Sequence, residues 1–475
     1  MSAADPPDTP VAPPGALGEP APPGALGEPA PPGALGEPAP PGVAGRTEPE
    51  QIAAEPAPAP PPRRSPAIPA PPRRLPRWRD LEPFLKTRPW HADAVERRLA
   101  RCVTVDDVER LARRRVPGAV FDYVHSGAES EVSLARNRDA FADVELRPTA
   151  WDAVGDPDTS TTLLGRPAAA PIVLAPTGYS RLSHHTGERA VAAAAAYAGM
   201  PYTLSTYGTT SIGDVAEAAP TGRNWFQFYV MRDRAVTDQH LAEAREHGYE
   251  AVMITIDTTV TGLKRKDLRN GFAIPPQLTL RTFADMARHP GWVANILTTE
   301  PLRFATFPAG SPYGLWGMSN QHREQRLRPS DVTTIKEQFG GPVVVKGVLS
   351  LSDAVRSVDA GADAIVLSNH GGRQLDRSPV PLELLPQVVD AVGDRAEVYL
   401  DSGVRSGADV VAALALGARA VLIGRPYLYG LMVGGQRGVD RVLEILTSEM
   451  ERTMSLVGVS RVDELRPEHV RLRRS

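Results

Sequence analysis

The chain has 475 residues, a formal net charge of −3 at pH 7, 48 prolines and one cysteine, Cys102. The nearly balanced charge gives no reason to expect a nucleic-acid partner, and a single cysteine excludes both an internal disulfide and a cysteine-based metal site, which suits a reducing cytoplasm. No stretch reaches the roughly 18 apolar residues of a membrane-spanning helix, and no long apolar run follows the arginine pairs of residues 61–77, so we expect no export signal.

Residues 1–75 differ in composition from the rest of the chain. Of the 48 prolines, 25 fall in residues 1–80, and the unit APPGALGEP occurs at 12–20, 21–29 and 30–38. Few aromatic or β-branched residues are present to form a core, so we predict a disordered tail rich in Pro, Gly and Ala. Its basic end, 61–77, could bind an acidic surface or a proline-reading module, but a solvated linker is the simpler interpretation.

A helical segment is predicted over residues 76–170, ahead of the main domain. The sequence TVDDVERLARRRV (104–116) has a capping threonine and apolar residues at helical spacing. Pro117 is then expected to begin a second helix, because proline is favoured in the first helical turn.

After residue 170 the pattern becomes regular and predicts eight buried strands. Short apolar runs occur at 171–177, 201–206, 224–230, 251–257, 342–347, 364–369, 397–403 and 420–425. Ala-rich helical stretches separate most of them, as expected for a parallel sheet covered on both faces. Eight units in about 255 residues favour a (β/α)8 TIM barrel over 171–470. An open doubly wound sheet is the alternative.

The connection between the fourth and fifth strands is about 85 residues long and includes a loop over 259–329. That is far more than one crossover helix needs. Long loops of this kind usually act as lids or docking surfaces, or are partly disordered.

Polar residues gather where these strands end, which is the end that carries the active site in a barrel. They are Thr177, Ser205, Gln227, Tyr229, Thr255, Asp257, Lys346, His370, Arg373, Asp401, Arg405, Gly424 and Arg425. A single polar residue at a strand end more often has a structural role than a functional one. Ionisable or amide groups at several strand ends are harder to explain without a ligand, because buried charges need partners.

These residues divide into groups with different chemistry. The glycines and arginines of DSGVRSG and IGRP suit a phosphate, although glycine can also serve close packing. Lys346 could stabilise negative charge on a bound ring. His370 could take a proton at neutral pH, with Asp257 to orient it, and Arg373 could hold a carboxylate through two hydrogen bonds.

Several motifs in order resemble the FMN-dependent α-hydroxy acid dehydrogenase and oxidase family over roughly residues 76–470. They are FDYVHSGAESE, APTGYSR, WFQFYV, VVVKGV, SNHGGRQLD, LDSGVRSG and LGARAVLIGRP. SGVR, LSTYGTTSI and HPGW…LTTEPL make the chain most similar to bacterial quinone- or cytochrome-linked L-lactate dehydrogenases. Residues 1–75 have no counterpart in the family.

The resemblance implies FMN as cofactor and no metal. Pro176, Thr177 and Gly178 would line the flavin, and Ser205, Gln227 and Thr255 would hydrogen-bond its ring. Lys346 would stabilise the reduced flavin, and Ser368 is also expected to bind the cofactor. The residues expected to hold the ribityl chain and phosphate are Asp401, Gly403, Arg405, Gly424 and Arg425.

The resemblance also implies the reaction, which is oxidation of an L-2-hydroxy acid, L-lactate first, to the 2-oxo acid. His370 would be the base, with Asp257 behind it. Arg373 and Tyr123 would bind the substrate carboxylate, and Tyr229 its hydroxyl side. Where the family has a second arginine for the carboxylate, this chain has Lys264, which keeps the charge but loses the planar fork.

Three alternatives remain open at this stage. They are an oxygen-using oxidase or monooxygenase of the same family, another FMN barrel such as an isomerase, and an inactive flavoprotein scaffold. The pair His370 and Arg373 argues against the last two. The expected partners are a small 2-hydroxy acid and an electron acceptor, which is a quinone, a cytochrome or oxygen. We also expect a tetramer-type homo-oligomer and a cytoplasmic protein, with peripheral attachment to the inner face of the membrane as a variant.

Overall fold

The computed structural model describes residues 69–85, 92–151, 154–271, 279–307 and 322–473. Its contacts divide the chain into two units, Met1–Lys86 and Thr87–Ser475. The described part of the first unit contains α1 (Trp78–Leu81) and the 3-10 turn η1 (Glu82–Phe84), neither with a buried residue. The tail predicted over 1–75 lies outside the described residues, except for 69–75.

The second unit contains a closed barrel of eight parallel strands. Around the barrel their order is β10-β11-β4-β5-β6-β7-β8-β9. The strands are β4 (Ile172–Leu174), β5 (Tyr202–Ser205), β6 (Asn224–Phe228), β7 (Ala251–Thr255), β8 (Val343–Val348), β9 (Ala364–Leu367), β10 (Glu397–Leu400) and β11 (Ala420–Ile423). Seven of them lie within the predicted runs and β8 ends one residue beyond its run of 342–347, so the barrel prediction is confirmed and the open sheet is excluded.

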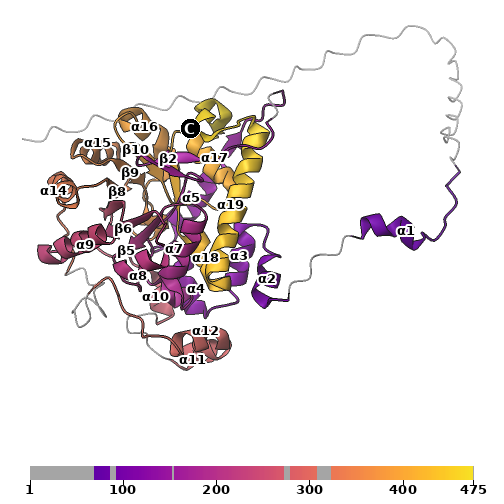
Figure 1. Ribbon diagram of the computed structural model, residues 1–475, viewed down its shortest axis with the longest axis horizontal. Helices are drawn as coiled ribbons and strands as arrows, with labels where there is room; N and C mark the ends of the chain where they lie inside the picture. The colour runs from indigo at the N-terminus through magenta and orange to yellow at the C-terminus, as the bar shows by residue number, and fades with distance from the viewer. Residues whose placement is uncertain (1–68, 86–91, 152–153, 272–278, 308–321, 474–475) are drawn as a thin grey trace, which may run out of the picture. The chain divides into compact units, whose positions relative to one another are not determined.

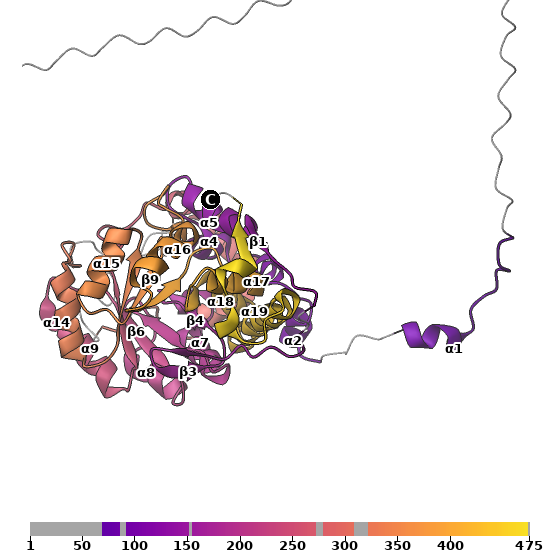
Figure 2. The same ribbon diagram turned by 90° about the horizontal axis from the view of Figure 1, so that it is seen from above.

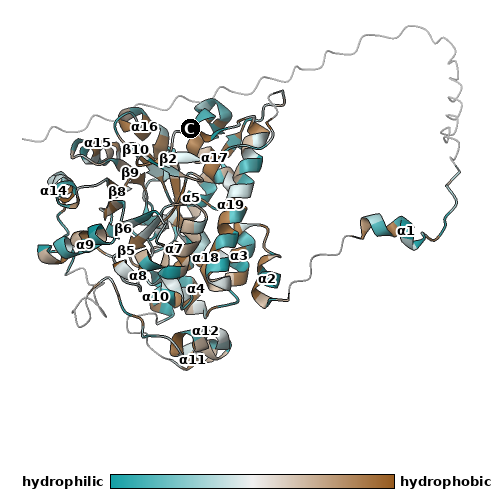
Figure 3. Ribbon diagram, in the orientation of Figure 1, coloured by the Kyte–Doolittle hydropathy of each residue, from teal (hydrophilic) through white to brown (hydrophobic). Residues whose placement is uncertain are grey.

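Helices surround the strands and cover their outer faces (Figures 1 and 2). They are α7 (Gly187–Tyr197), α8 (Ile212–Ala218), α9 (Arg234–Glu246), α14 (Pro329–Phe339), α15 (Leu351–Asp359), α16 (Pro381–Val392), α17 (Gly407–Ala415) and α18 (Arg425–Gly434), with the long α19 (Gln436–Val457). Because helices cover one face and the barrel interior the other, the strands are buried along their length, apart from the half-buried Glu397 at the start of β10. Figure 3 shows the contrast between strands that are mostly brown and helices with teal outer faces.

The barrel interior is filled at one end and open at the other. Trp225 and Tyr399 stack inside it, with ring centroids 6.1 Å apart. The hairpin of β2 (Thr161–Leu163) and β3 (Arg166–Ala168) adds the buried Leu163 and Ala168 to this inner cluster. Since these residues meet the amino-terminal halves of the strands, any ligand has to enter at the carboxyl ends.

The segment before the barrel contains the expected helices, α2 (Ala94–Leu99), α3 (Val105–Ala112), α4 (Gly118–His125) and α5 (Val132–Ala142). Thr104 caps α3 through a reciprocal pair of bonds with Asp107, as its sequence predicts. The segment is not purely helical, however. Besides the hairpin it includes β1 (Val144–Leu146), which pairs with β12 (Val470–Leu472), and such three-residue strands leave almost no periodic signal.

The long connection after β7 contains three helices in its described part. They are α10 (Arg265–Arg269), α11 (Leu280–Ala287) and α12 (Pro290–Leu297). Leu280, Phe283 and Leu297 are exposed on α11 and α12. Within the described ranges, no helix is both long enough and apolar enough to cross a membrane.

Candidate active site

A cavity opens at the carboxyl ends of the strands, with an empty volume of about 1310 Å³ including its mouth. It is lined by 17 of the 19 predicted site residues: Tyr123, Pro176, Thr177, Gly178, Ser205, Gln227, Tyr229, Thr255, Lys264, Lys346, His370, Arg373, Asp401, Gly403, Arg405, Gly424 and Arg425. The two other predicted residues, Asp257 and Ser368, lie directly behind this lining.

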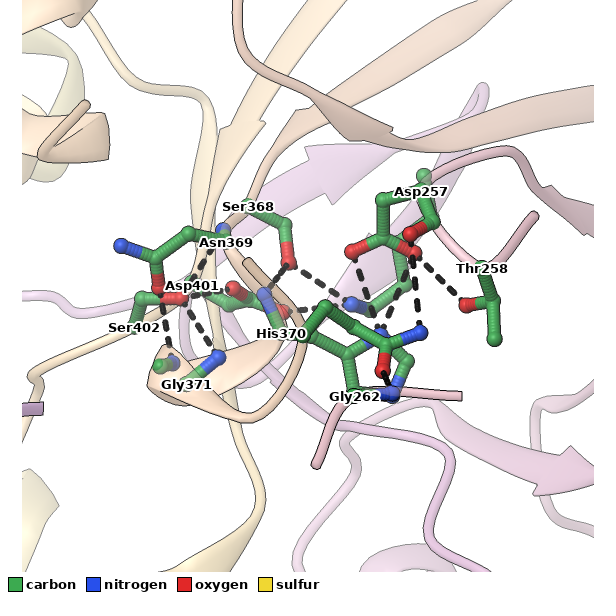
Figure 4. A network of polar contacts seen from close by, with 12 residues as sticks. Asp257, Thr258, Gly262, Ser368, Asn369, His370, Gly371, Asp401 and Ser402 are labelled. Carbon is green, nitrogen blue, oxygen red and sulfur yellow. Dashed lines mark hydrogen bonds and ion pairs between the residues drawn. The ribbon is translucent and has the colours of Figure 1, made fainter. Parts of the chain in front are cut away.

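His370 and Asp257 form the central pair of the cavity (Figure 4). The Nδ1 atom of His370 lies 3.2 Å from both carboxylate oxygens of Asp257. Burial alone would raise the pKa of Asp257, but the adjoining His370 and then Lys346 hold it below its usual value. The ionised carboxylate therefore accepts the Nδ1 proton, which leaves Nε2 as the basic nitrogen on the cavity side.

The loop that carries His370 is held in an unusual backbone conformation. His370 has φ 58°, in the left-handed region that few non-glycine residues adopt. Its own N–H donates to Ser368 Oγ at 3.0 Å, and the N–H of Gly371 donates to Ser402 Oγ at 3.0 Å. Asn369 exchanges amide hydrogen bonds with Asn137 of α5. These bonds offset the strain and fix the imidazole.

Lys346 lies in the cavity wall with two partners, Ser368 and Asp401, both labelled in Figure 4. Its Nζ atom is 2.8 Å from Ser368 Oγ and 2.8 Å from Asp401 Oδ2. The register of β8 shifts at the next residue, Gly347, where a Cβ would come within 2.6 Å of Asp257 Cγ. The bulge thus admits Asp257 behind His370 and leaves Lys346 facing the cavity.

Arg373 is anchored by one edge of its guanidinium. Its Nη1 donates to the carbonyl oxygens of Tyr123, Val124 and Ser126, at 2.8, 3.2 and 2.9 Å. Its carbon Cζ lies 5.5 Å from the ring centroid of Tyr123. Because these contacts fix the plane of the fork, Nε and Nη2 can be offered to a carboxylate in one orientation.

The strand ends of β10 and β11 form a second positive region. Arg425 donates to Val124 and Ser126 carbonyls at 3.0 Å, and burial lowers its pKa to about 9, which leaves it a cation at neutral pH. Gly424 precedes α18, whose N-terminus faces this end. A Cβ at Gly424 would meet nothing closer than 3.6 Å, whereas one at Gly403 would lie 2.3 Å from the Asn137 carbonyl. Gly403 is thus required for packing on α5.

The cavity between these regions contains buried polar atoms that suit a flat heterocycle. Ser205 Oγ donates to Gln227 Oε1 at 3.0 Å, while Gln227 Nε2 is buried with no partner among the described atoms. Arg405 Nε is in the same condition. A buried donor without a partner is costly, so these two atoms fit the ring carbonyl and the phosphate of the FMN expected from the sequence. Thr177 instead turns its hydroxyl to Tyr427, 2.6 Å away.

Tyr229 and Lys264 lie on the opposite side of the barrel from β10 and β11. Burial raises the pKa of Tyr229 to about 12, so its hydroxyl keeps its proton. Burial, then repulsion from Arg373, lowers the pKa of Lys264 to about 8, against the pull of Asp267. Arg265, the neighbouring residue in sequence, points instead toward Ser130 and Glu129 and does not line the cavity.

Sequence reasoning missed several lining residues, chiefly Tyr207, Thr258, Thr261 and Arg323. Arg323 is the most informative, because it is a cation with only 3% of its surface exposed. It lies in the long connection after β7, far along the sequence from the end of any strand. The other three follow strands without a charge to single them out. Among the described residues, no cluster of His, Cys, Asp and Glu could hold a metal ion.

Comparison with known proteins agrees with this geometry. The family model described as FMN-dependent dehydrogenase matches residues 112–472. A Mycobacterium tuberculosis protein named "Putative L-lactate dehydrogenase" is 48% identical over 398 residues, which is 84% of this chain and 96% of that protein. The L-lactate oxidase of a Nostoc species is 39% identical over 366 residues, covering 76% and 96% of the two chains.

A solved structure is also similar throughout the barrel. It is the monotopic membrane protein (S)-mandelate dehydrogenase, with a TM-score of 0.76 and 34% identity over 78% of this chain and 100% of that one. The family match covers well over half of the present sequence. The chain therefore belongs to the FMN-dependent dehydrogenases, as a TIM-barrel enzyme that uses FMN to oxidise 2-hydroxy acids.

Proposed function

We propose that this enzyme oxidises L-2-hydroxy acids to 2-oxo acids, with L-lactate as its simplest substrate. The observation that carries the proposal is the His370–Asp257 pair, whose free Nε2 lies in the same cavity as Arg373. A base and a carboxylate-binding fork three residues apart suit an acid whose reacting carbon bears the carboxylate. The name of the 48% identical relative supports lactate.

In this proposal the cavity would hold FMN. Arg405, Arg425 and the N-terminus of α18 would hold its phosphate, and Gln227 Nε2 would donate to its ring. Lys346 would supply a positive charge to the ring. When bound, FMN accepts the two electrons that leave the substrate α-carbon.

Side chains of the protein then bind and orient the substrate and accept its proton. Arg373 and Lys264 bind the α-carboxylate, and the Tyr229 hydroxyl lies near the substrate oxygen. His370 Nε2 takes the proton released as the α-carbon is oxidised, and the imidazolium is stabilised by Asp257, 3.2 Å from Nδ1. Asp257 is a positioning residue, since it acts only through His370.

The electron acceptor separates the two candidate functions. A quinone or cytochrome acceptor makes the enzyme a dehydrogenase, and oxygen makes it an oxidase, as the name of the Nostoc relative states for that protein. We favour a membrane quinone with peripheral attachment, because Leu280, Phe283 and Leu297 expose apolar surface on α11 and α12. Co-sedimentation with anionic vesicles should fall when Phe283 becomes serine. Unchanged sedimentation would remove this surface from the proposal.

Anaerobic mixing with L-lactate tests the reaction itself. The absorbance of the bound flavin should bleach, and pyruvate should appear in equal amount. Reoxidation of the reduced enzyme by a soluble quinone should then outpace reoxidation by oxygen. A flavin that stays oxidised with every L-2-hydroxy acid would overturn the proposed function, and faster reoxidation by oxygen would favour the oxidase.

A further inference from the structure

Backbone hydrogen bonds, rather than the flexibility of its own side chain, place Arg323 at the cavity. Residues 322–324 run antiparallel to residues 230–232, which follow β6. The N–H of Arg232 donates to the His322 carbonyl at 3.0 Å, and that of Glu324 to the Val230 carbonyl at 2.8 Å. These bonds place Arg323 beside the end of β6, although it is far away in sequence.

The guanidinium of Arg323 is fixed within the cavity wall. Its carbon Cζ lies 5.2 Å from the ring centroid of Tyr229, and its Nη2 donates to Thr261 Oγ1 at 2.9 Å. In the barrel order, β6 and β7 lie opposite β10 and β11. Arg323 is therefore at the end away from the phosphate-binding arginines Arg405 and Arg425. We call this the substrate end.

The substrate end carries more positive charge than one carboxylate needs. Arg373, Lys264 and Arg323 all line it. Among the described lining residues of the whole cavity, Asp401 is the one carboxylate, and it pairs with Lys346. Asp267, behind Lys264, offsets part of the charge, and the two undescribed segments of the long connection after β7, 272–278 and 308–321, contain no Asp or Glu in their sequence.

Buried positive charge of this density is best matched by an anionic ligand. An α-carboxylate on Arg373 and Lys264 brings one negative charge. Burial lowers the pKa of Lys264 to about 8, and repulsion from Arg373 and Arg323 adds to that effect, so the three cations lie close enough to repel one another. A second negative group, on the substrate side chain, would balance the positive charge of Arg323.

We propose that the enzyme also oxidises L-2-hydroxy dicarboxylates, with the distal carboxylate held by Arg323. The inference rests on the proposed function, because it uses the same base and the same α-carboxylate site. The reaction is unchanged: the substrate loses two electrons and two protons and becomes the 2-oxo diacid, His370 Nε2 taking one proton and bound FMN taking the two electrons with the other proton. The competing interpretation is that Arg323 supplies a second fork for the α-carboxylate and so compensates for Lys264.

The test compares substrates of equal shape and different charge. L-malate and L-2-hydroxyglutarate are each compared with the amide of their distal carboxyl group, and L-lactate serves as the short reference. Flavin reduction is measured anaerobically. For at least one pair, the wild-type kcat/KM should favour the diacid by about tenfold or more, as expected for a charge-assisted hydrogen bond.

Variants of Arg323 then locate the source of that preference. Arg323→Leu should reduce the diacid-to-amide ratio by about tenfold or more, whereas Arg323→Lys should retain part of it. Arg326→Leu is the matched control, since it removes the same charge from an exposed residue in the same segment and should keep the wild-type ratio. FMN content and thermal melting show that each variant is folded.

A binding measurement separates affinity from chemistry. Titrating the flavin spectrum with 2-oxoglutarate and with 2-oxopentanoate should show tighter binding of the diacid to the wild type and not to Arg323→Leu. Equal losses for L-lactate and the diacids would assign Arg323 to the α-carboxylate and overturn the inference. So would a wild type that prefers the amides. Reduction by L-lactate in those experiments would leave the proposed function standing, and its absence with all substrates would refute both.

Discussion

The two ends of the cavity are built in different ways. One end, proposed to hold the phosphate and called here the phosphate end, is formed by residues that follow β10 and β11, with Arg405 and Arg425 beside the N-terminus of α18. The substrate end is assembled from segments distant in sequence, since Tyr123 belongs to α4, Lys264 precedes α10, and Arg323 lies next to residues that follow β6.

This difference separates cofactor binding, which is the same for every substrate, from substrate recognition, which can vary. Strand ends of a barrel are fixed by the sheet register, so a cofactor bound there is held the same way whatever the substrate. Segments in long connections can change without disturbing the barrel. We therefore expect cofactor binding and substrate choice to respond separately to substitution, while His370 between the two ends affects neither affinity strongly.

The largest effect is expected at His370. His370→Gln should keep FMN but slow anaerobic flavin reduction by about 10²–10⁴, the usual cost of losing a positioned base. His247→Gln, on an exposed residue at the end of α9, is the control and should reduce at the wild-type rate. Reduction of the His370 variant at near wild-type speed would exclude it as the base.

The sequence was informative about His370 for a physical reason. It follows a buried strand, as does Asp401, while Lys346 lies near the end of another, and parallel strands place all such residues at one end of a barrel. Both the eight strands and the cavity that they support were predictable on that ground. Nothing in the local sequence marks the hairpin β2–β3 or the pairing of β1 with β12, because each strand has only three residues.

Arg323 was unpredictable for a different reason. Its position depends on a pairing of residues 322–324 with 230–232, about 90 residues earlier in the chain. An arginine in a long polar connection is ordinarily exposed, and only the folded structure shows it buried. The sequence predicts that Lys264 keeps the charge of the family's second arginine but loses its planar fork. The structure adds a second cation nearby, Arg323, which no local motif revealed.

A paired substitution tests whether the two ends are independent. Arg405→Gln should weaken FMN binding by about 10- to 100-fold, since it removes hydrogen bonds to a charged phosphate, and should leave reduction of the bound flavin nearly unchanged. Arg373→Lys should do the reverse, with normal FMN affinity, a higher KM for L-lactate and slower reduction, because lysine lacks the fork. FMN affinity is read from flavin fluorescence.

Arg326→Gln serves as the control for both and should change neither quantity. A large rise in KM for the Arg405 variant with FMN saturating, or loss of FMN from the Arg373 variant, would show that the two ends are coupled. The comparison drawn above would then fail, although the assignment of the base would not.

The smallest effect is expected at Lys264, where the pH profile is the sharper measurement. Burial and Arg373 lower its pKa to about 8, with Asp267 acting in the opposite sense and Arg323 adding to the repulsion. The side chain is charged below that pH and neutral above it. If Lys264 binds the α-carboxylate, kcat/KM for L-lactate should fall as the pH rises through 8, since this ratio reports the free enzyme.

Lys264→Arg removes that titration, because a guanidinium stays protonated throughout the accessible range. The alkaline limb near pH 8 should therefore shift upward, and the half-saturating concentration should fall severalfold if the added fork reaches the carboxylate. Lys266→Arg is the matched control, since Lys266 lies two residues further on, in α10, but pairs with Glu131 at 2.8 Å and does not line the cavity. If Lys264→Arg and Lys264→Ala both keep the wild-type limb and KM, Lys264 is not a substrate ligand. Arg265 is directed toward Glu129 and could not replace it, so the carboxylate would then depend on Arg373 and Arg323.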